Sequence, residues 1–157
     1  MKYLGAVFVF FFGMVLHWWW STYFTVWGLA PHLLLILTVA ISASSGPVAG
    51  QCYGFMWGLF LDVIGVHLFG ANALVMTLVG YLVGSIRRQM DVSSPLSQTM
   101  VVAAVTVSYL FALAGLGLAF DHQAYWAGWG GAFSMPLVNA LAAPLLFPIV
   151  QRTVGEL

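Results

Sequence analysis

The sequence predicts an all-α membrane protein, a polytopic bundle of six transmembrane helices that forms a single integral membrane domain over residues 1–157. Composition is the first reason: hydrophobic residues make up 62% of the chain and charged residues only 5%, against about 25% in soluble globular proteins. The second is that the apolar residues fall into six runs separated by turn residues. The third is that glycines recur at four-residue spacing within two of these runs, as they do where membrane helices pack closely.

Charge and cysteine content exclude several classes of protein. Four basic and four acidic residues give a formal net charge of zero, so the chain has no basic patch for nucleic acid. The single cysteine, Cys52, cannot form an internal disulfide, and we do not expect thiolate ligation of a metal. The chain has no HExxH, Gly-x-Ser-x-Gly or phosphate-binding pattern. We therefore expect no catalytic, cofactor-binding or metal-binding residues, and no enzyme activity.

The candidate spans are the six apolar segments, Tyr3–His17, Leu33–Ala43, Val48–Val66, Phe69–Ile86, Met100–Phe120 and Ala132–Val150. A spanning helix needs about 20 residues. The last four segments meet this length, and the first does so when the tryptophan-rich end that follows it is included. The second segment has a core of only 11 residues. It is a tilted short span, a re-entrant hairpin, or a helix lengthened by the small polar residues Ser42–Ser45.

The basic residues indicate the orientation. Lys2 precedes the first segment, Arg87 and Arg88 follow the fourth, and Arg152 follows the sixth. With six spans and a cytoplasmic N-terminus, all four lie on the inner side of the membrane, as the positive-inside rule requires. The residues after the first apolar run lack the small-residue pattern of a signal-peptide cleavage site, so we expect this segment to be a retained helix.

Tryptophan and tyrosine gather in the two segments that this orientation places outside. Trp18, Trp19, Trp20, Tyr23 and Trp27 are expected in the first outer loop, and Tyr125, Trp126 and Trp129 in the last. Such rings prefer the membrane–water interface. The two interpretations are an ordinary interface belt and a docking surface for a membrane or extracytoplasmic partner.

Two glycine ridges are the candidates for helix packing. Gly50, Gly54 and Gly58 step along one face of the third segment and lead to Asp62. On the fourth segment the corresponding ridge consists of Asn72, Met76, Gly80 and Gly84. Because a short turn joins the two segments, we expect the ridges to face each other. Small residues also step along the fifth segment, and in the sixth Pro144 and Pro148 free backbone carbonyls.

Asp62 has two possible roles. A carboxylate inside an apolar run costs about 2.5–3.5 kcal/mol to insert at a helix centre, so we expect it to have a structural or functional role. It either accepts hydrogen bonds from the following turn and holds the third helix to the fourth, or it is an ion or proton site of a transporter. The nearest polar side chains in the sequence are His67 and Asn72.

Most of the chain loosely resembles the bacterial rod shape-determining protein family MreD, and the resemblance is best over residues 31–88. The residues that carry the resemblance are Pro31 with its apolar helix, Gly54-Phe-Met-Trp-Gly-Leu-Phe-Leu-Asp62, the turn Leu68-Phe-Gly70, and Gly80-Tyr-Leu-Val. Asn139 followed by Pro144 and Arg152 gives a weaker likeness in the last helix. His32 departs from the family pattern, in which Asp or Asn often follows the proline.

The resemblance implies a non-enzymatic scaffold subunit of the cell-wall elongation machinery (the elongasome, which extends peptidoglycan) in the bacterial cell (inner) membrane. Its implied partners are an MreC-like single-span protein and, in the wider assembly, MreB, RodA and a class B penicillin-binding protein, besides membrane lipid. The family also resembles the substrate-binding subunits of energy-coupling-factor transporters. The alternative function is therefore a small-molecule-binding transporter subunit, with an outer pocket lined by His67, Asn72, Asp121, His122 and Gln123.

Overall fold

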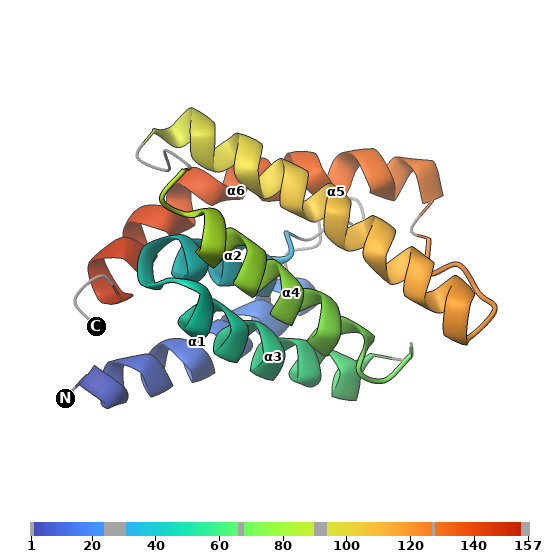
Figure 1. Ribbon diagram of the computed structural model, residues 1–157, viewed down its shortest axis with the longest axis horizontal. Coiled ribbons are helices and arrows are strands. Elements are labelled where there is room, and N and C mark those ends of the chain that lie inside the picture. The colour runs from blue at the N-terminus through green and yellow to red at the C-terminus, as the bar shows by residue number, and fades with distance from the viewer. Residues whose placement is uncertain (1, 24–30, 66–67, 90–93, 127, 155–157) are drawn as a thin grey trace.

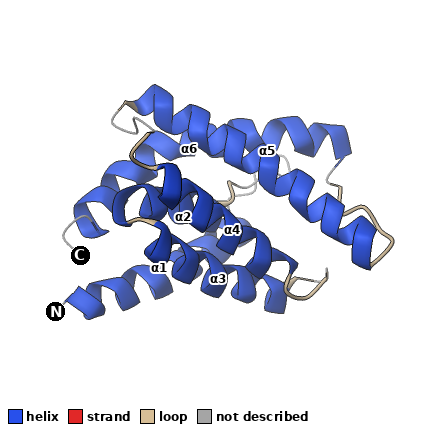
Figure 2. Cartoon of the chain, viewed as in Figure 1, coloured by secondary structure: helices blue, strands red, loops and turns tan. Residues whose placement is uncertain are grey.

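The computed structural model describes the chain apart from residues 1, 24–30, 66–67, 90–93, 127 and 155–157. The described residues form six α-helices and contain no strand (Figure 1, Figure 2). In chain order the helices are α1 (Lys2–Tyr23), α2 (Leu33–Ser45), α3 (Pro47–Ile64), α4 (Ala71–Ile86), α5 (Pro95–Phe120) and α6 (Gly128–Val154). The all-helical architecture expected from the sequence is therefore confirmed.

The helices run up and down the bundle, so their connections fall at two ends (Figure 1). The start of α1, the end of α6 and the α4–α5 connection lie at one end, which we call the arginine end because it carries Arg87, Arg88 and Arg152. The α3–α4 and α5–α6 connections lie at the opposite end.

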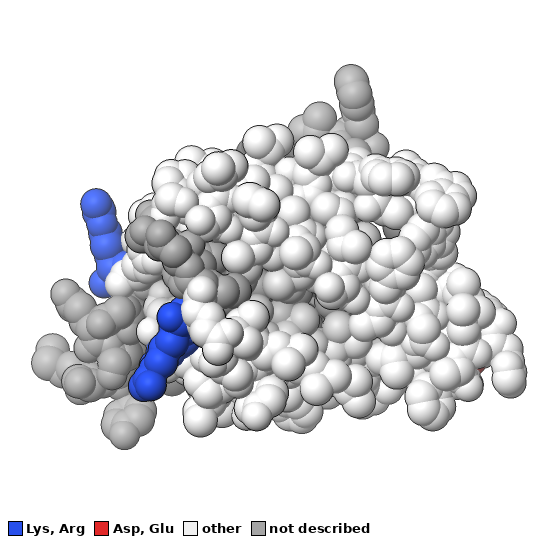
Figure 3. All heavy atoms as spheres, turned by 45° about the horizontal axis from the view of Figure 1, so that its top comes forward, with Lys and Arg blue, Asp and Glu red and all other residues white. Residues whose placement is uncertain are grey.

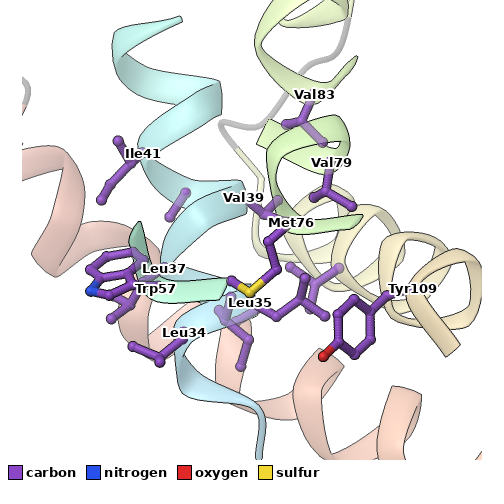
Figure 4. Close-up of a cluster of buried hydrophobic side chains, with 14 of the residues drawn as sticks. Leu34, Leu35, Leu37, Val39, Ile41, Trp57, Met76, Val79, Val83 and Tyr109 are labelled. Atoms are coloured by element: carbon purple, nitrogen blue, oxygen red, sulfur yellow. The ribbon is translucent and has the colours of Figure 1, made fainter. Parts of the chain in front are cut away.

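α2 is the central helix of the bundle. Its ten residues from Leu33 to Ser42 are all buried, and it contacts α3, α4 and α6. A helix that is apolar on every face is expected to lie inside a protein, and α2 does so. Its hydroxyls donate to carbonyls one turn earlier, Thr38 to Leu34 at 2.8 Å and Ser42 to Thr38 at 2.5 Å. Figure 4 shows the leucines of α2 among core side chains of the neighbouring helices.

A single residue, Gly46, connects α2 to α3. Its φ of 98° lies in the left-handed region that glycine adopts without steric penalty, and Pro47 then begins α3 at a position where a missing N–H is tolerated. The guanidinium of Arg87 donates to the carbonyl of Ser44 at 3.0 Å, which satisfies one of the last carbonyls of α2. The expected lengthening of the second segment by Ser42–Ser45 is observed, because α2 continues through Ser45.

The remaining helices differ from the predicted segments at their ends. α1 continues to Tyr23 rather than ending at His17. α5 begins at Pro95 because the hydroxyl of Ser94 caps it, accepting from the backbone N–H of Ser97 at 3.2 Å. Within the described chain, Pro95–Phe120 and Gly128–Thr153 are the two helices long and apolar enough to cross a membrane, so a count of six spans stays a prediction.

Apolar side chains cover the outside of the bundle. Phe11 on α1 and Leu141 on α6, for example, are 58% and 71% exposed. On the face drawn in Figure 3, lysine and arginine gather toward one end and most of the surface carries no charge. Large continuous apolar surfaces are rare on soluble proteins, whereas lipid accommodates them.

Candidate functional site

Asp62 caps the start of α4 from the neighbouring helix. The residue is only 5% exposed, near the end of α3. Its Oδ1 accepts from the backbone N–H of Asn72 at 3.0 Å and from the Asn72 side-chain amide at 2.9 Å, and its Oδ2 accepts from the N–H of Ala73 at 2.9 Å. α4's own N-cap residue is Gly70, which has no side chain to offer.

Asn72 and Ala73 are the second and third residues of α4, and their N–H groups are the ones that an N-cap side chain normally accepts from. A carboxylate also interacts favourably with the positive end of the helix dipole. Asp62 therefore fixes the end of α3 to the start of α4. An N-cap side chain ordinarily contributes about 0.5–2 kcal/mol to the free energy of unfolding.

From Asn72 the hydrogen bonds continue to α5 and to the start of α2. The hydroxyl of Tyr109 donates to Oδ1 of Asn72, and Nε2 of His32 lies 3.2 Å from the same hydroxyl. His32 is the N-cap residue of α2, and its Nδ1 accepts from the N–H of Leu35 at 3.2 Å. Because Nδ1 accepts, the neutral ring carries its proton on Nε2 and donates it toward Tyr109.

A second branch reaches α6. The backbone N–H of His32 donates to Oδ1 of Asn139 at 2.7 Å, and the Asn139 amide donates to Oγ1 of Thr106 at 3.1 Å. The hydroxyl of Thr106 donates a hydrogen bond to the carbonyl of Val102 at 2.7 Å. Asn139 and Thr106 are fully buried. We call the six side chains of both branches the polar network: His32, Asp62, Asn72, Thr106, Tyr109 and Asn139.

The polar network joins α3, α4, α5, α6 and the start of α2. Its hydrogen bonds point in consistent directions, and both Asp62 oxygens are occupied by donors. A fully satisfied buried network of this kind fixes the relative positions of helices, whereas an incomplete one destabilises them. As a proton path it is interrupted at Asn72, because a carboxamide does not take up a proton at one atom and release it at another.

The glycine ridges of α3 and α4 lie against each other. A Cβ added at Gly54 would lie 2.4 Å from the carbonyl oxygen of Met76, and one at Gly80 would lie 2.2 Å from the carbonyl oxygen of Gly50. At the two ends of the contact, a Cβ added at Gly58 would lie 2.5 Å from the Cα of Ala73, and one added at Gly84 would lie 2.4 Å from the Cα of Pro47. The two helices thus meet backbone to backbone along their length.

A smaller set of contacts joins the two connections at the end away from the arginines. Tyr125 accepts from the backbone N–H of Leu68 at 3.1 Å and donates to the carboxylate of Asp121. This hydrogen bond to Asp121 is the main cause that raises the pKa of the Tyr125 phenol above its ordinary value. The α5–α6 connection is therefore tied to the turn before α4.

The predicted aromatic clusters are only partly in loops. Trp18, Trp19, Trp20 and Tyr23 belong to the last turns of α1, and Trp129 belongs to the first turn of α6. The expectation of outer loops is wrong for these five residues. Neither glycine nor proline interrupts the chain from Trp18 to Tyr23, so α1 continues through them, and α6 begins at Gly128 although Gly130 and Gly131 follow Trp129. Trp126 lies in the α5–α6 connection, 5.6 Å from Trp129 between ring centroids. Trp27 lies outside the described residues.

Of the five residues expected to line an outer pocket, the four that the structure describes are not gathered in one. Asn72 is buried in the polar network, and Asp121 is bonded to Tyr125. His122 and Gln123 are exposed in the α5–α6 connection, and His67 lies outside the described residues. Among the described residues, no group of three histidine, cysteine, aspartate or glutamate side chains is placed to hold a metal ion.

Sequence reasoning paired Asp62 with Asn72 but did not find the rest of the network. No local sequence pattern points to Tyr109 or Thr106, and Asn139 stands out only through the family resemblance. The available signal was the rarity of polar side chains in these apolar segments: such groups are usually bonded to one another inside a bundle.

An apolar exterior, two helices of membrane-spanning length and a polar network confined to the interior define an all-helical membrane protein. Comparison with known families agrees and is more specific: residues 1–153 match the family of the rod shape-determining protein MreD. The chain belongs to the MreD family, a family of membrane-associated, shape-determining structural proteins. No curated protein and no solved structure gives a significant match.

Proposed function

We propose that this protein is a non-enzymatic scaffold subunit of the cell-wall elongation machinery in the bacterial cell (inner) membrane. In this proposal it crosses the membrane six times with both termini in the cytoplasm, which puts the arginine end inside. It binds an MreC-like single-span partner and works with MreB, RodA and a class B penicillin-binding protein. Membership of the MreD family supports a role in rod shape, and the family's general association with MreC-type partners supports binding of the MreC-like protein.

The observation that carries the proposal is that the buried polar groups form hydrogen bonds between helices. Asp62, Asn72 and Tyr109 are each bonded to another helix, and the carboxylate has no free oxygen. Such groups hold the bundle in one arrangement and leave its function to its outer surface. That surface is apolar, so within a membrane it is available to lipid and to the helices of other membrane proteins.

The alternative, a small-molecule-binding transporter subunit related to the energy-coupling-factor proteins, has less support. Its candidate polar residues are buried in the network, bonded elsewhere or exposed, as described above. A proton relay through Asp62 would have to cross the amide of Asn72, which is a poor relay group.

Co-purification tests the scaffold. The chain and its MreC-like partner are co-expressed, and the partner recovered on an affinity tag is measured for wild type, Gly54→Leu and Val63→Leu. Gly54 faces the backbone of α4, whereas Val63 is 68% exposed on the same helix. We expect Gly54→Leu to lose the partner because it forces α3 and α4 apart, and Val63→Leu to retain it. Absence of the partner from the wild-type preparation would refute the proposal.

A further inference from the structure

A groove between α1 and α6 is not used by the polar network or by the glycine ridges. It encloses about 160 Å³. One wall is formed by residues of α1 between Phe8 and Leu16, the other by residues of α6 between Leu146 and Thr153, and Leu37 of α2 contributes to the lining. We call it the α1–α6 groove. Thr153, at the arginine end, is the one polar side chain among its lining residues.

The groove exists because α1 is held from its other side. Trp57 of α3 donates from its indole nitrogen to the carbonyl of Phe10 at 3.2 Å, and the two rings stack with centroids 6.0 Å apart. Gly13 lies so close to the same indole that an added Cβ would be 3.0 Å from it. α1 is thus fixed against α3, and the space toward α6 stays unfilled by protein.

The α1 wall of the groove carries a stacked pair of aromatic rings. Phe8 and Phe12 stack on each other with centroids 5.7 Å apart and planes 15° apart, although both are more than half exposed. From Phe8 to Leu16 the α1 wall extends about 12 Å at 1.5 Å per residue. The hydrocarbon of one bilayer leaflet is about 15 Å thick, half of the usual 30 Å. The groove therefore has the length of one leaflet's acyl chains.

The described charged side chain nearest in sequence to the groove is basic. Arg152 is exposed on the last turn of α6, next to the lining residue Thr153 and three residues beyond the lining residue Ile149. The described residues include two carboxylates, Asp62 and Asp121, and both are bonded at the opposite end of the bundle. α6 is 27 residues long, so about 40 Å separates its two ends. An occupant that matches both features has an apolar chain and an anionic head.

We propose that the α1–α6 groove binds one anionic glycerophospholipid, with an acyl chain between α1 and α6 and its phosphate at Arg152. A basic side chain near the membrane surface adds about 1 kcal/mol of attraction to an anionic lipid, which is about fivefold in affinity. The groove therefore prefers phosphatidylglycerol over phosphatidylcholine by about that factor.

Native mass spectrometry of the delipidated full-length protein tests this, with dioleoylphosphatidylglycerol and dioleoylphosphatidylcholine titrated in turn. Two matched pairs of variants test separately the contact with the lipid headgroup and the contact with the acyl chain. Arg152→Gln is compared with Arg88→Gln, which removes the same charge from an exposed arginine at the end of α4. Ile149→Trp fills the groove, and Leu145→Trp adds the same bulk to an exposed α6 residue that does not line it.

We expect wild type to hold one phosphatidylglycerol about fivefold more tightly than phosphatidylcholine. Arg152→Gln should remove that preference and Ile149→Trp should weaken binding of both lipids, while the two control variants behave like wild type. Equal effects within either pair would overturn the proposal. So would a dimer in wild type that Ile149→Trp converts to monomer with lipid retention unchanged, because a second copy would then occupy the groove.

Discussion

Replacing Gly54 by alanine should strongly destabilise the protein, because α3 and α4 meet there backbone to backbone. The added Cβ would lie 2.4 Å from the carbonyl oxygen of Met76 and 2.8 Å from its carbonyl carbon. A carbon–oxygen contact normally needs about 3.3 Å, so one helix has to move by about 0.9 Å. The neighbouring contacts of Gly50 with Gly80 and of Gly58 with Ala73 resist that movement.

Overpacking a well-packed contact costs about 1–3 kcal/mol, and we expect about 2–3 kcal/mol here because backbone rather than a flexible side chain has to yield. For a chain of this size that corresponds to a fall in melting temperature of about 4–12 °C. The control is Gly115→Ala on α5, where an added Cβ meets nothing within 4 Å. Alanine should stabilise that helix by about 0.5–1 kcal/mol, since glycine is a poor helix former.

The assay is unfolding of the purified protein in mild detergent, by heat and by titration with sodium dodecyl sulfate, followed by circular dichroism and tryptophan fluorescence. Opposite signs for the two alanine variants are the expected result. If Gly54→Ala were as stable as wild type, the close contact of α3 with α4 would be wrong.

Three further predictions follow from the network and the topology. Asp62→Asn should lose about 1.5–3 kcal/mol of stability, because one charge-assisted hydrogen bond is lost and an amide N–H₂ faces a backbone N–H. Asp62→Leu should lose more in the same unfolding assay, and equal stability of the two variants would argue against the capping role. Tyr109→Phe should lose about 1–3 kcal/mol of stability, because the side chains of Asn72 and His32 each lose a buried hydrogen bond. An unchanged melting temperature would mean that this hydroxyl does not form these hydrogen bonds. Single cysteines at Ser94 and Gln123, in a chain lacking Cys52, should be labelled by an impermeant thiol reagent from opposite sides of the membrane, and same-side labelling would end the topology proposal.

The contact between Asp62 and Asn72 could be predicted because chain connectivity sets it. Only a short turn separates α3 from α4. Asp62, near the end of α3, and Asn72, near the start of α4, are therefore held close together. Four-residue spacing likewise placed the glycines on one face of each helix, whatever the rest of the bundle does.

The links to Tyr109 and Asn139 could not be predicted in this way. They lie 37 and 107 residues from their partners Asn72 and His32, and no local connection fixes the register of α5 and α6 against the other helices. The central position of α2 was missed for a related reason. Its short length suggested a marginal span, although the lack of a polar face already favoured burial. α1 ends at Tyr23 rather than at the predicted His17, because tryptophan does not terminate a helix.

The most direct test of the scaffold account compares rod shape with complex recovery in the same cells. Cells that depend on the chain carry wild type, Gly115→Ala, Gly54→Ala, Asp62→Asn or Tyr109→Phe, and both cell shape and the amount of MreC-like partner recovered are measured. If the polar network only holds the bundle together, loss of rod shape should follow loss of the recovered complex across all five proteins. A variant such as Asp62→Asn that assembles a full complex and still leaves the cells round would contradict the account, because a titrating group rather than an assembled scaffold would then be needed.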